Sequence, residues 1–220
     1  MKSGLGRTAI AILIVLTIFS HLGCSSAKYS AGFKSEKKQI DALTIFSPLV
    51  NVTFKKDQLT YIDTAFSTSI QQQMEEITLE VLSSKFNVEQ VSLSSVNQKA
   101  LFDLFHKLDN SPKTLDAISS GSLFEINPGC NSRYAVLLTF HSEINANFGP
   151  HQNVSTGMAT NSIIIAPHTK PHSELRLMVL DMNNDEIVFC DMIKSSNFDP
   201  RIESEIKHKT KTILKKVYYF

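Results

Sequence analysis

The sequence predicts a single α+β domain whose mixed sheet combines early β–α units, a late antiparallel meander and a C-terminal helix. Three observations predict this fold class. In the first half of the chain, short apolar runs alternate with segments whose apolar residues recur every three or four positions. In the second half, two apolar runs flank the turn-forming residues Asn183–Asp185. After Pro200, isoleucine, leucine and valine recur at helical spacing to the end of the chain.

Length and composition fit one globular domain with its own core. The chain has 220 residues, of which 42% are apolar and 20% are charged. A net charge of +1 gives no positive field for nucleic acid, so we expect no nucleic-acid partner. Three cysteines are too few for a disulfide-built scaffold, and a single long apolar run excludes a multi-span membrane protein. We place the globular domain at residues 39–220.

Residues 1–23 have the pattern of a bacterial lipoprotein signal peptide. Lys2 and Arg7 provide a basic start, and Ala9–Phe19 is an apolar run of 11 residues, which is short for a membrane span. A small glycine then precedes Cys24. The pattern predicts that Cys24 becomes the lipidated, palmitate-bearing first residue of the mature protein, which anchors it to the membrane.

The residues around Cys24 bear on where the protein resides. His21 stands three residues before Cys24, where such signals prefer leucine, so an ordinary secretory signal or an uncleaved anchor stays open as an alternative. No aspartate follows Cys24, and resemblance to enterobacterial lipoprotein sorting then implies the outer membrane, with the domain facing the periplasm. Residues 24–38 are small, polar and basic without periodicity, and we expect them to be a flexible tether.

The first half of the domain is expected to begin with strands. Ile40–Phe46 is an apolar run that stops at Ser47–Pro48, which is typical of a buried strand. Val50, Val52 and Phe54 alternate with polar residues and predict a second strand.

Helical spacing follows. We expect a long helix from about Leu59 to Ser84, with Thr60 and Asp63 as its capping pair. A brief strand is expected at Phe86–Val91, and a second helix over Val96–Leu108. Ser111–Pro112 then predicts the start of a further short helix, with serine as its cap.

Strands dominate the second half, which follows a turn predicted at Asn127–Gly129. Asp199–Pro200 predicts the N-cap and first-turn proline of the last helix, whose apolar face runs from Ile202 to Val217. The expected strands are the apolar runs Tyr134–Phe140, Ser162–Ala166, Leu175–Met182 and Ile187–Ile193.

The order of these elements carries a family resemblance. A lipoprotein signal, an "ALTIFSPL" first strand, a "SSKFNVEQV" step after the long helix, a "YAVLLTF" strand and an "LRLMVLDMNNDEIVF" hairpin succeed one another. This order resembles the periplasmic lipoprotein modules related to CsgG, the peptidoglycan-synthase activator lipoproteins and the amino-terminal domain of TolB. Their common "vlDvxtGeivw" hairpin corresponds to Asp181–Phe189, with Asp185 in place of the glycine and Phe189 in place of the tryptophan. The resemblance implies an envelope lipoprotein or a subunit of an outer-membrane secretion complex.

Histidines provide the weak candidates for a metal site. His168 and His172 have a spacing that a metal site can use. However, Pro167 and Pro171 place the pair in a loop rather than on one helix face. We therefore favour solvated loop histidines and expect no metal and no other cofactor.

Two cysteines are left after lipidation. In the oxidising envelope, Cys130 and Cys190 are candidates for one disulfide, and two free buried thiols are the alternative. Neither cysteine lies in a recognisable nucleophile motif, and the chain has no serine-hydrolase, zinc-protease or phosphate-loop signature. We therefore expect no enzymatic activity. The alternative is an enzyme whose active site matches none of these motifs.

One segment is unusual in charge. Residues 144–169 contain no Asp, Glu, Lys or Arg, and interface cores are depleted of such charges. Phe148 and Met158 are its candidate apolar anchors for a partner, and a flexible connection between two strands is the alternative. We expect a membrane-anchored, non-catalytic interaction or assembly module that contacts another envelope protein and can oligomerise.

Overall fold

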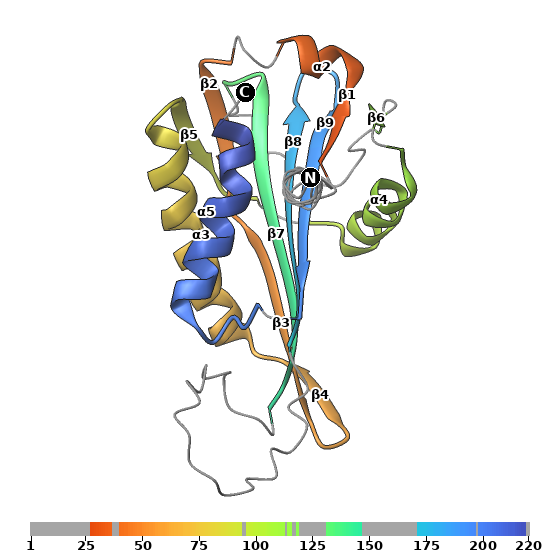
Figure 1. Ribbon diagram of the computed structural model, residues 1–220, viewed down its shortest axis with the longest axis vertical. Helices are drawn as coiled ribbons and strands as arrows, with labels where there is room; N and C mark the ends of the chain where they lie inside the picture. Colours follow the sequence, from red (N-terminus) through yellow and green to blue (C-terminus); the bar gives the residue numbers. More distant parts are fainter. Residues whose placement is uncertain are drawn as a thin grey trace, which may run out of the picture.

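Strand β7 (Tyr134–Asn145) is the centre of one mixed sheet in the computed structural model (Figure 1). The structure describes residues 27–36, 40–93, 96–112, 114–115, 118, 131–146, 171–196 and 198–218. One edge of β7 carries two parallel strands end to end, β2 (Ala42–Phe46) and β3 (Leu49–Lys56). Its other edge pairs antiparallel with β8 (His172–Asp181), which pairs with β9 (Glu186–Ser195). The predicted mixed sheet with a late antiparallel meander is confirmed.

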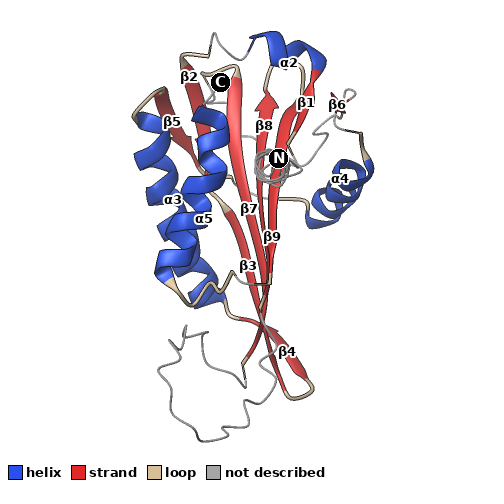
Figure 2. Ribbon diagram, in the orientation of Figure 1, coloured by secondary structure: helices blue, strands red, loops and turns tan. Residues whose placement is uncertain are grey.

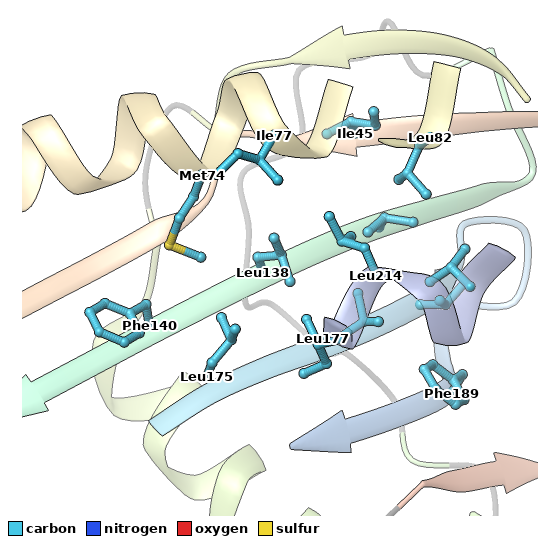
Figure 3. Close-up of a cluster of buried hydrophobic side chains, with 14 of the residues drawn as sticks. Ile45, Met74, Ile77, Leu82, Leu138, Phe140, Leu175, Leu177, Phe189 and Leu214 are labelled. Atoms are coloured by element: carbon cyan, nitrogen blue, oxygen red, sulfur yellow. The ribbon is translucent and has the colours of Figure 1, made fainter. Parts of the chain in front are cut away.

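Two helices lie side by side on one face of this sheet, α3 (Thr64–Ser83) and α5 (Glu203–Tyr218) (Figure 2). After α3, β5 (Asn87–Val91) pairs parallel with β2, which completes the predicted early β–α unit. Burial of one leucine, isoleucine or phenylalanine side chain stabilises a fold by roughly 1.5–3 kcal/mol, so the layer between helices and sheet holds both helices in place. Figure 3 shows part of this layer: Met74, Ile77 and Leu82 of α3 and Leu214 of α5 with Leu138, Phe140, Leu175 and Leu177 of the sheet.

The long helix begins later than predicted. Residues Leu59–Ile62 form strand β4, which pairs antiparallel with β3. Asp57 has a φ of 55°, so the chain reverses there into a hairpin. Asp63 is the N-cap of α3, since its carboxylate accepts the Phe66 N–H at 2.9 Å. The prediction of a helix from Leu59 with a Thr60 cap is wrong, because the apolar spacing at the start belongs to exposed hairpin side chains.

Helix α4 (Gln98–Asn110) packs on the opposite face of the sheet and confirms the second predicted helix. Its buried leucines contact side chains that β7 and β8 turn toward this face. Ser111 does not start a new helix. It caps the end of α4, with its N–H and hydroxyl both donating to the Leu108 carbonyl, and Thr114–Leu115 form the short strand β6.

Part of the predicted tether belongs to the fold. Lys28–Ser30 form strand β1, which pairs with β9 and β6, and Ala31–Glu36 form helix α2. Phe33 is only 3% exposed, in the core under Tyr134. The Lys28 ammonium donates to the carbonyls of Leu108 and Ser111 at the end of α4. The prediction of a flexible tether over all of residues 24–38 is therefore wrong. It rested on the small, polar composition of the segment, which does not show that single residues such as Phe33 are buried.

The last helix confirms its predicted apolar face, since Ile206, Ile213 and Val217 are fully buried. However, α5 begins at Glu203, and Asp199–Pro200 lie in the turn before it. The predicted turn at residues 127–129 and the predicted strand at residues 162–166 lie outside the described residues. None of the described helices combines the length and apolarity needed to traverse a lipid bilayer.

Candidate binding cleft

The outer edge of the sheet is open between the ends of two strands. β5 accompanies β2 as far as Val91, whose carbonyl accepts the Ser47 N–H at 3.1 Å. β4 accompanies β3 only from Val52 onward, where the Val52 carbonyl accepts the Asp63 N–H at 3.2 Å. Between these two points, residues 48–51 have no strand beside them on this edge within the described part of the chain.

A cavity of about 760 Å³ lies at this opening, and we call it the edge cleft. The start of α3 borders it on one face of the sheet and one flank of α4 borders it on the other. Its floor is made by polar side chains of β7, β8 and β9. Cavities of roughly 300–1,000 Å³ are typical of sites for small ligands, so the edge cleft is large enough to hold one.

The strand register explains why polar side chains gather on the floor. Thr139 pairs with Arg176, and His141 pairs with Glu174, so all four side chains point to the α4 face of the sheet. Nearer the other end of these strands, the same face is apolar and covered by α4. The edge cleft therefore lies where α4 stops covering the sheet and the exposed part of the face becomes polar.

Arg176 is the charged centre of the floor, although its residue is only 3% exposed. Its guanidinium donates to both Asp109 oxygens, at 2.8 and 2.9 Å, and through Nε to Glu174. It also lies 4.5 Å from the centroid of the Phe105 ring, within the range of a cation–π contact. Lys194 lies 3.0 Å from Glu174. The two cations and two anions neutralise one another, so the floor presents no net charge to a ligand. The Arg176–Asp109 pair also joins α4 to the sheet.

The electrostatics of Asp109 follow from this network. Hydrogen bonds from Arg176 lower the pKa of the Asp109 carboxyl below its ordinary value, and burial opposes this shift. The positive charges of Arg176, Lys194 and Lys28 lower it further. Asp109 is thus held in its ionised form as a fixed partner of Arg176.

One wall of the cleft is apolar, and the other is polar but uncharged. Leu101, Phe102 and Phe105 come from α4, and Leu49 and Val50 come from β3. Phe102 is 70% exposed, although aromatic side chains usually lose water on folding. On the other side the lining is made of hydroxyl and amide groups from α3, namely Thr64, Ser67 and Gln71. The arrangement suits a neutral ligand with one apolar and one polar side.

Of the two predicted histidines, the structure describes only His172. His172 is exposed at the start of β8, opposite Glu143, whose carboxylate is ion-paired with Lys55. Among the described residues, no three His, Cys, Asp or Glu side chains are grouped to hold a metal ion. His168 lies outside the described residues.

Other predicted residues fall largely beyond the described part of the chain. Cys24, Cys130, Phe148 and Met158 lie outside it, so lipidation, the disulfide and the uncharged contact surface stay predictions. Cys190 is buried in β9, and burial raises the pKa of its thiol to about 12. A thiol with this pKa is protonated at neutral pH and is a poor nucleophile.

The edge cleft was not predicted from the sequence, although two signals in the sequence point to it. Phe102 lies on the polar side of an amphipathic helix whose apolar side is formed by Leu101, Leu104 and Leu108. Arg176 interrupts the apolar run of residues 175–180 in β8, and a charge in such a place needs a buried partner. The gap in the sheet edge itself has no signal in the sequence, because it depends on where β4 and β5 end.

No protein-family model and no curated protein matches the chain. Among solved structures, it is similar to a putative neuraminyllactose-binding hemagglutinin homolog from Helicobacter pylori, with 10% identity, a TM-score of 0.38 and coverage of 82% of this chain and 83% of the other. It is also similar to the PelC dodecamer from Paraburkholderia phytofirmans, with 13% identity, a TM-score of 0.35 and coverage of 81% of this chain and 88% of the other. A third similar structure is lipoprotein GNA1162 from Neisseria meningitidis, with 8% identity, a TM-score of 0.30 and coverage of 82% and 99%. Likeness at these values does not indicate a function.

Proposed function

We propose that this protein is a lipid-anchored binding module of the bacterial envelope, which contacts another envelope protein through the edge cleft and catalyses no reaction. The observation that carries the proposal is Phe102, an aromatic side chain left 70% exposed at the wall of an open cavity. Exposed aromatic residues beside a pocket are typical anchors of protein interfaces. The lipoprotein signal supports the place of action, with Cys24 as the lipid anchor, at the outer membrane facing the periplasm.

The chemistry of the cleft supports binding over catalysis. The carboxylates of Asp109 and Glu174 are bound to Arg176 and Lys194, so neither is a free acid or base, and the other titratable side chains of the lining are His106 and His141. The Cys190 thiol has a raised pKa and is buried. The segment with Phe148 and Met158 stays a second candidate contact surface, as proposed from its lack of charge.

The proposal is tested by photocrosslinking in living cells. A benzophenone amino acid replaces Phe102, and a matched chain carries it instead at His208, an exposed position of α5 on the opposite face of the sheet. We expect Phe102 to give one dominant adduct with an envelope protein and His208 to give none. Adducts that are absent at Phe102, or the same at both positions, would contradict the cleft as the contact site.

Assembly into a secretion complex, the alternative raised by the CsgG resemblance, has a separate test. A ring-forming subunit elutes from detergent extracts as one large oligomer of the chain with itself. We expect instead that the extracted chain elutes as a small species, whose mass increases only when the crosslinked partner is present.

A further inference from the structure

We propose that the edge cleft binds an extended, uncharged segment of the partner protein, which adds as a short strand to the open edge of β3 beside Val50. This inference rests on the proposed function and specifies how the partner is held. It is carried by the backbone of β3, by the different chemistry of the two walls and by the neutral charge of the floor.

The backbone of β3 is the first step. Both polar backbone groups of Val52 face away from β7, because its N–H donates to Ser67 Oγ (3.1 Å) and its carbonyl accepts the Asp63 N–H (3.2 Å). Since backbone groups alternate sides along a strand, Val50 turns its N–H and carbonyl to the same outer edge. No hydrogen bond from another described element reaches Val50 there. Its donor and acceptor therefore face the cleft.

An irregularity in the sheet produces this exposed residue. Ile45 pairs with Val136 and Leu49 pairs with Thr139, so the outer row advances four residues while β7 advances three. The extra residue lies at Ser47–Pro48, between β2 and β3. Bulges of this kind re-aim the backbone and are over-represented beside functional sites. Here the bulge separates the part of the edge covered by β5 from the part that faces the cleft.

The two walls indicate which side chains the segment carries. Side chains of an added strand alternate between the two faces of the sheet. On one face they meet Leu101 and Phe102 of α4, and on the other they meet Thr64 and Gln71 of α3. The best segment therefore alternates apolar residues with serine, threonine or glutamine.

The floor indicates that the segment is uncharged. Asp109 and Glu174 are satisfied by Arg176 and Lys194, so a charged ligand has to disrupt a pair or remain unpaired in the cleft. An uncharged segment leaves this network intact. In an antiparallel pair, a single residue of such a segment can donate its N–H to the Val50 carbonyl and accept the Val50 N–H with its own carbonyl.

The test uses the full chain extracted in detergent and a capped pentapeptide, acetyl-Thr-Val-Thr-Val-Thr-amide, as the probe. Binding is measured by calorimetry, and hydrogen exchange follows the Val50 amide. We expect the probe to slow exchange at Val50. We also expect N-methylation of its central threonine to weaken binding about tenfold, the effect of losing one or two backbone hydrogen bonds.

Two variants of the chain sharpen the test. Val50→Pro removes the outward N–H but no hydrogen bond to β7, and proline is tolerated at sheet edges, so we expect about tenfold weaker probe binding with an unchanged fold. Val50→Ile keeps the N–H and a branched apolar side chain, and we expect it to weaken probe binding much less than Val50→Pro does. If Val50→Pro fails to fold, the N-methylated probe still decides the question with the unmodified chain.

Each other outcome overturns the inference. It fails if no probe binds, if binding is insensitive to N-methylation, or if the Val50 amide is not protected. Preferential binding of tri-N-acetylchitotriose assigns the cleft to acetamido sugars instead, and self-association that Val50→Pro abolishes assigns it to a second copy. If the partner still crosslinks at Phe102 and Val50→Pro has no effect on it, strand addition fails while the proposed function stands.

Discussion

Arg176 holds the Asp109 carboxylate with two hydrogen bonds of 2.8 and 2.9 Å, although the two residues come from β8 and α4 and lie 67 positions apart. Together with the stacking of Arg176 on Phe105, this pair fixes how α4 lies against the sheet and therefore how wide the edge cleft is.

Replacing Asp109 with alanine is expected to destabilise the fold by about 1.5–3 kcal/mol, the usual contribution of hydrogen bonds to a charged group. The physical reason is that Arg176 stays buried with one of its two acceptors lost. Urea unfolding measures the change. Asp103→Ala, an exposed position of the same helix, is the matched control and is expected to have little effect. Equal values for the two variants would show that the ion pair does not stabilise the docking of α4.

The same pair predicts a loss of stability in acid. Because the pKa of Asp109 is lower in the folded protein than its ordinary value, the unfolded chain binds the proton more readily. The contribution of the pair is thus present above about pH 4, the ordinary range of an aspartate, and is lost as the pH falls through the lowered pKa. Unfolding free energies measured between pH 6 and pH 3 test this, with a shallower acid dependence expected for Asp109→Asn. An unchanged dependence in that variant would be the contrary result.

Lys28→Met is expected to destabilise the fold by about 1 kcal/mol, since it removes a cation and a hydrogen-bond donor from the C-terminal end of α4. Chemical denaturation is again the measurement. Lys34→Met in α2, where the side chain is exposed, is the control and should leave stability nearly unchanged. Two variants that behave alike would place Lys28 outside the cooperative fold.

The proposed disulfide between Cys130 and Cys190 is tested by counting reactive thiols in denaturant. We expect neither cysteine to react with iodoacetamide until a reductant is added. Two reactive thiols before reduction would rule the disulfide out. Cys190 would then be a buried thiol, unreactive in the native protein because burial raises its pKa to about 12.

Lipidation is tested with radiolabelled palmitate in growing cells. Label is expected to enter the wild-type chain and to be absent from Cys24→Ala, because only the thiol at this position can accept the lipid at the processing site. Cys190→Ala serves as the control and should label normally. Equal labelling of the wild type and Cys24→Ala would exclude the lipoprotein assignment.

The elements that were predicted correctly are those whose burial pattern repeats along the chain. β7, β8 and α4 each carry several buried apolar residues at the spacing of one regular structure, so the pattern alone identifies them. Strand β4 was missed because Leu59 and Ile62 have a spacing that also fits a helix, while the deciding feature is the positive φ of Asp57. β1 was missed because three half-buried residues are too few to show a period.

The edge cleft is a property of the tertiary structure. It exists because β5 and β4 accompany the outer row of the sheet over different stretches and leave Val50 between them. No residue pattern in β2 or β3 indicates where the neighbouring strand, β5 or β4, ends. Arg176 could be recognised from the sequence as a charge that needs a partner, but Asp109, the residue that provides it, could not.

The position of β1 also sets a distance. Lys28 is the fourth residue after Cys24, and four fully extended residues span at most about 14 Å. If Cys24 is lipidated as proposed, the backbone of Lys28 is kept within that reach of the bilayer surface, and the end of α4 that Lys28 caps lies one lysine side chain farther along. Asp109 of the edge cleft belongs to this same end of the helix. Because this connection is so short, a partner can bind in the edge cleft only within the thin layer of periplasm next to the lipid headgroups.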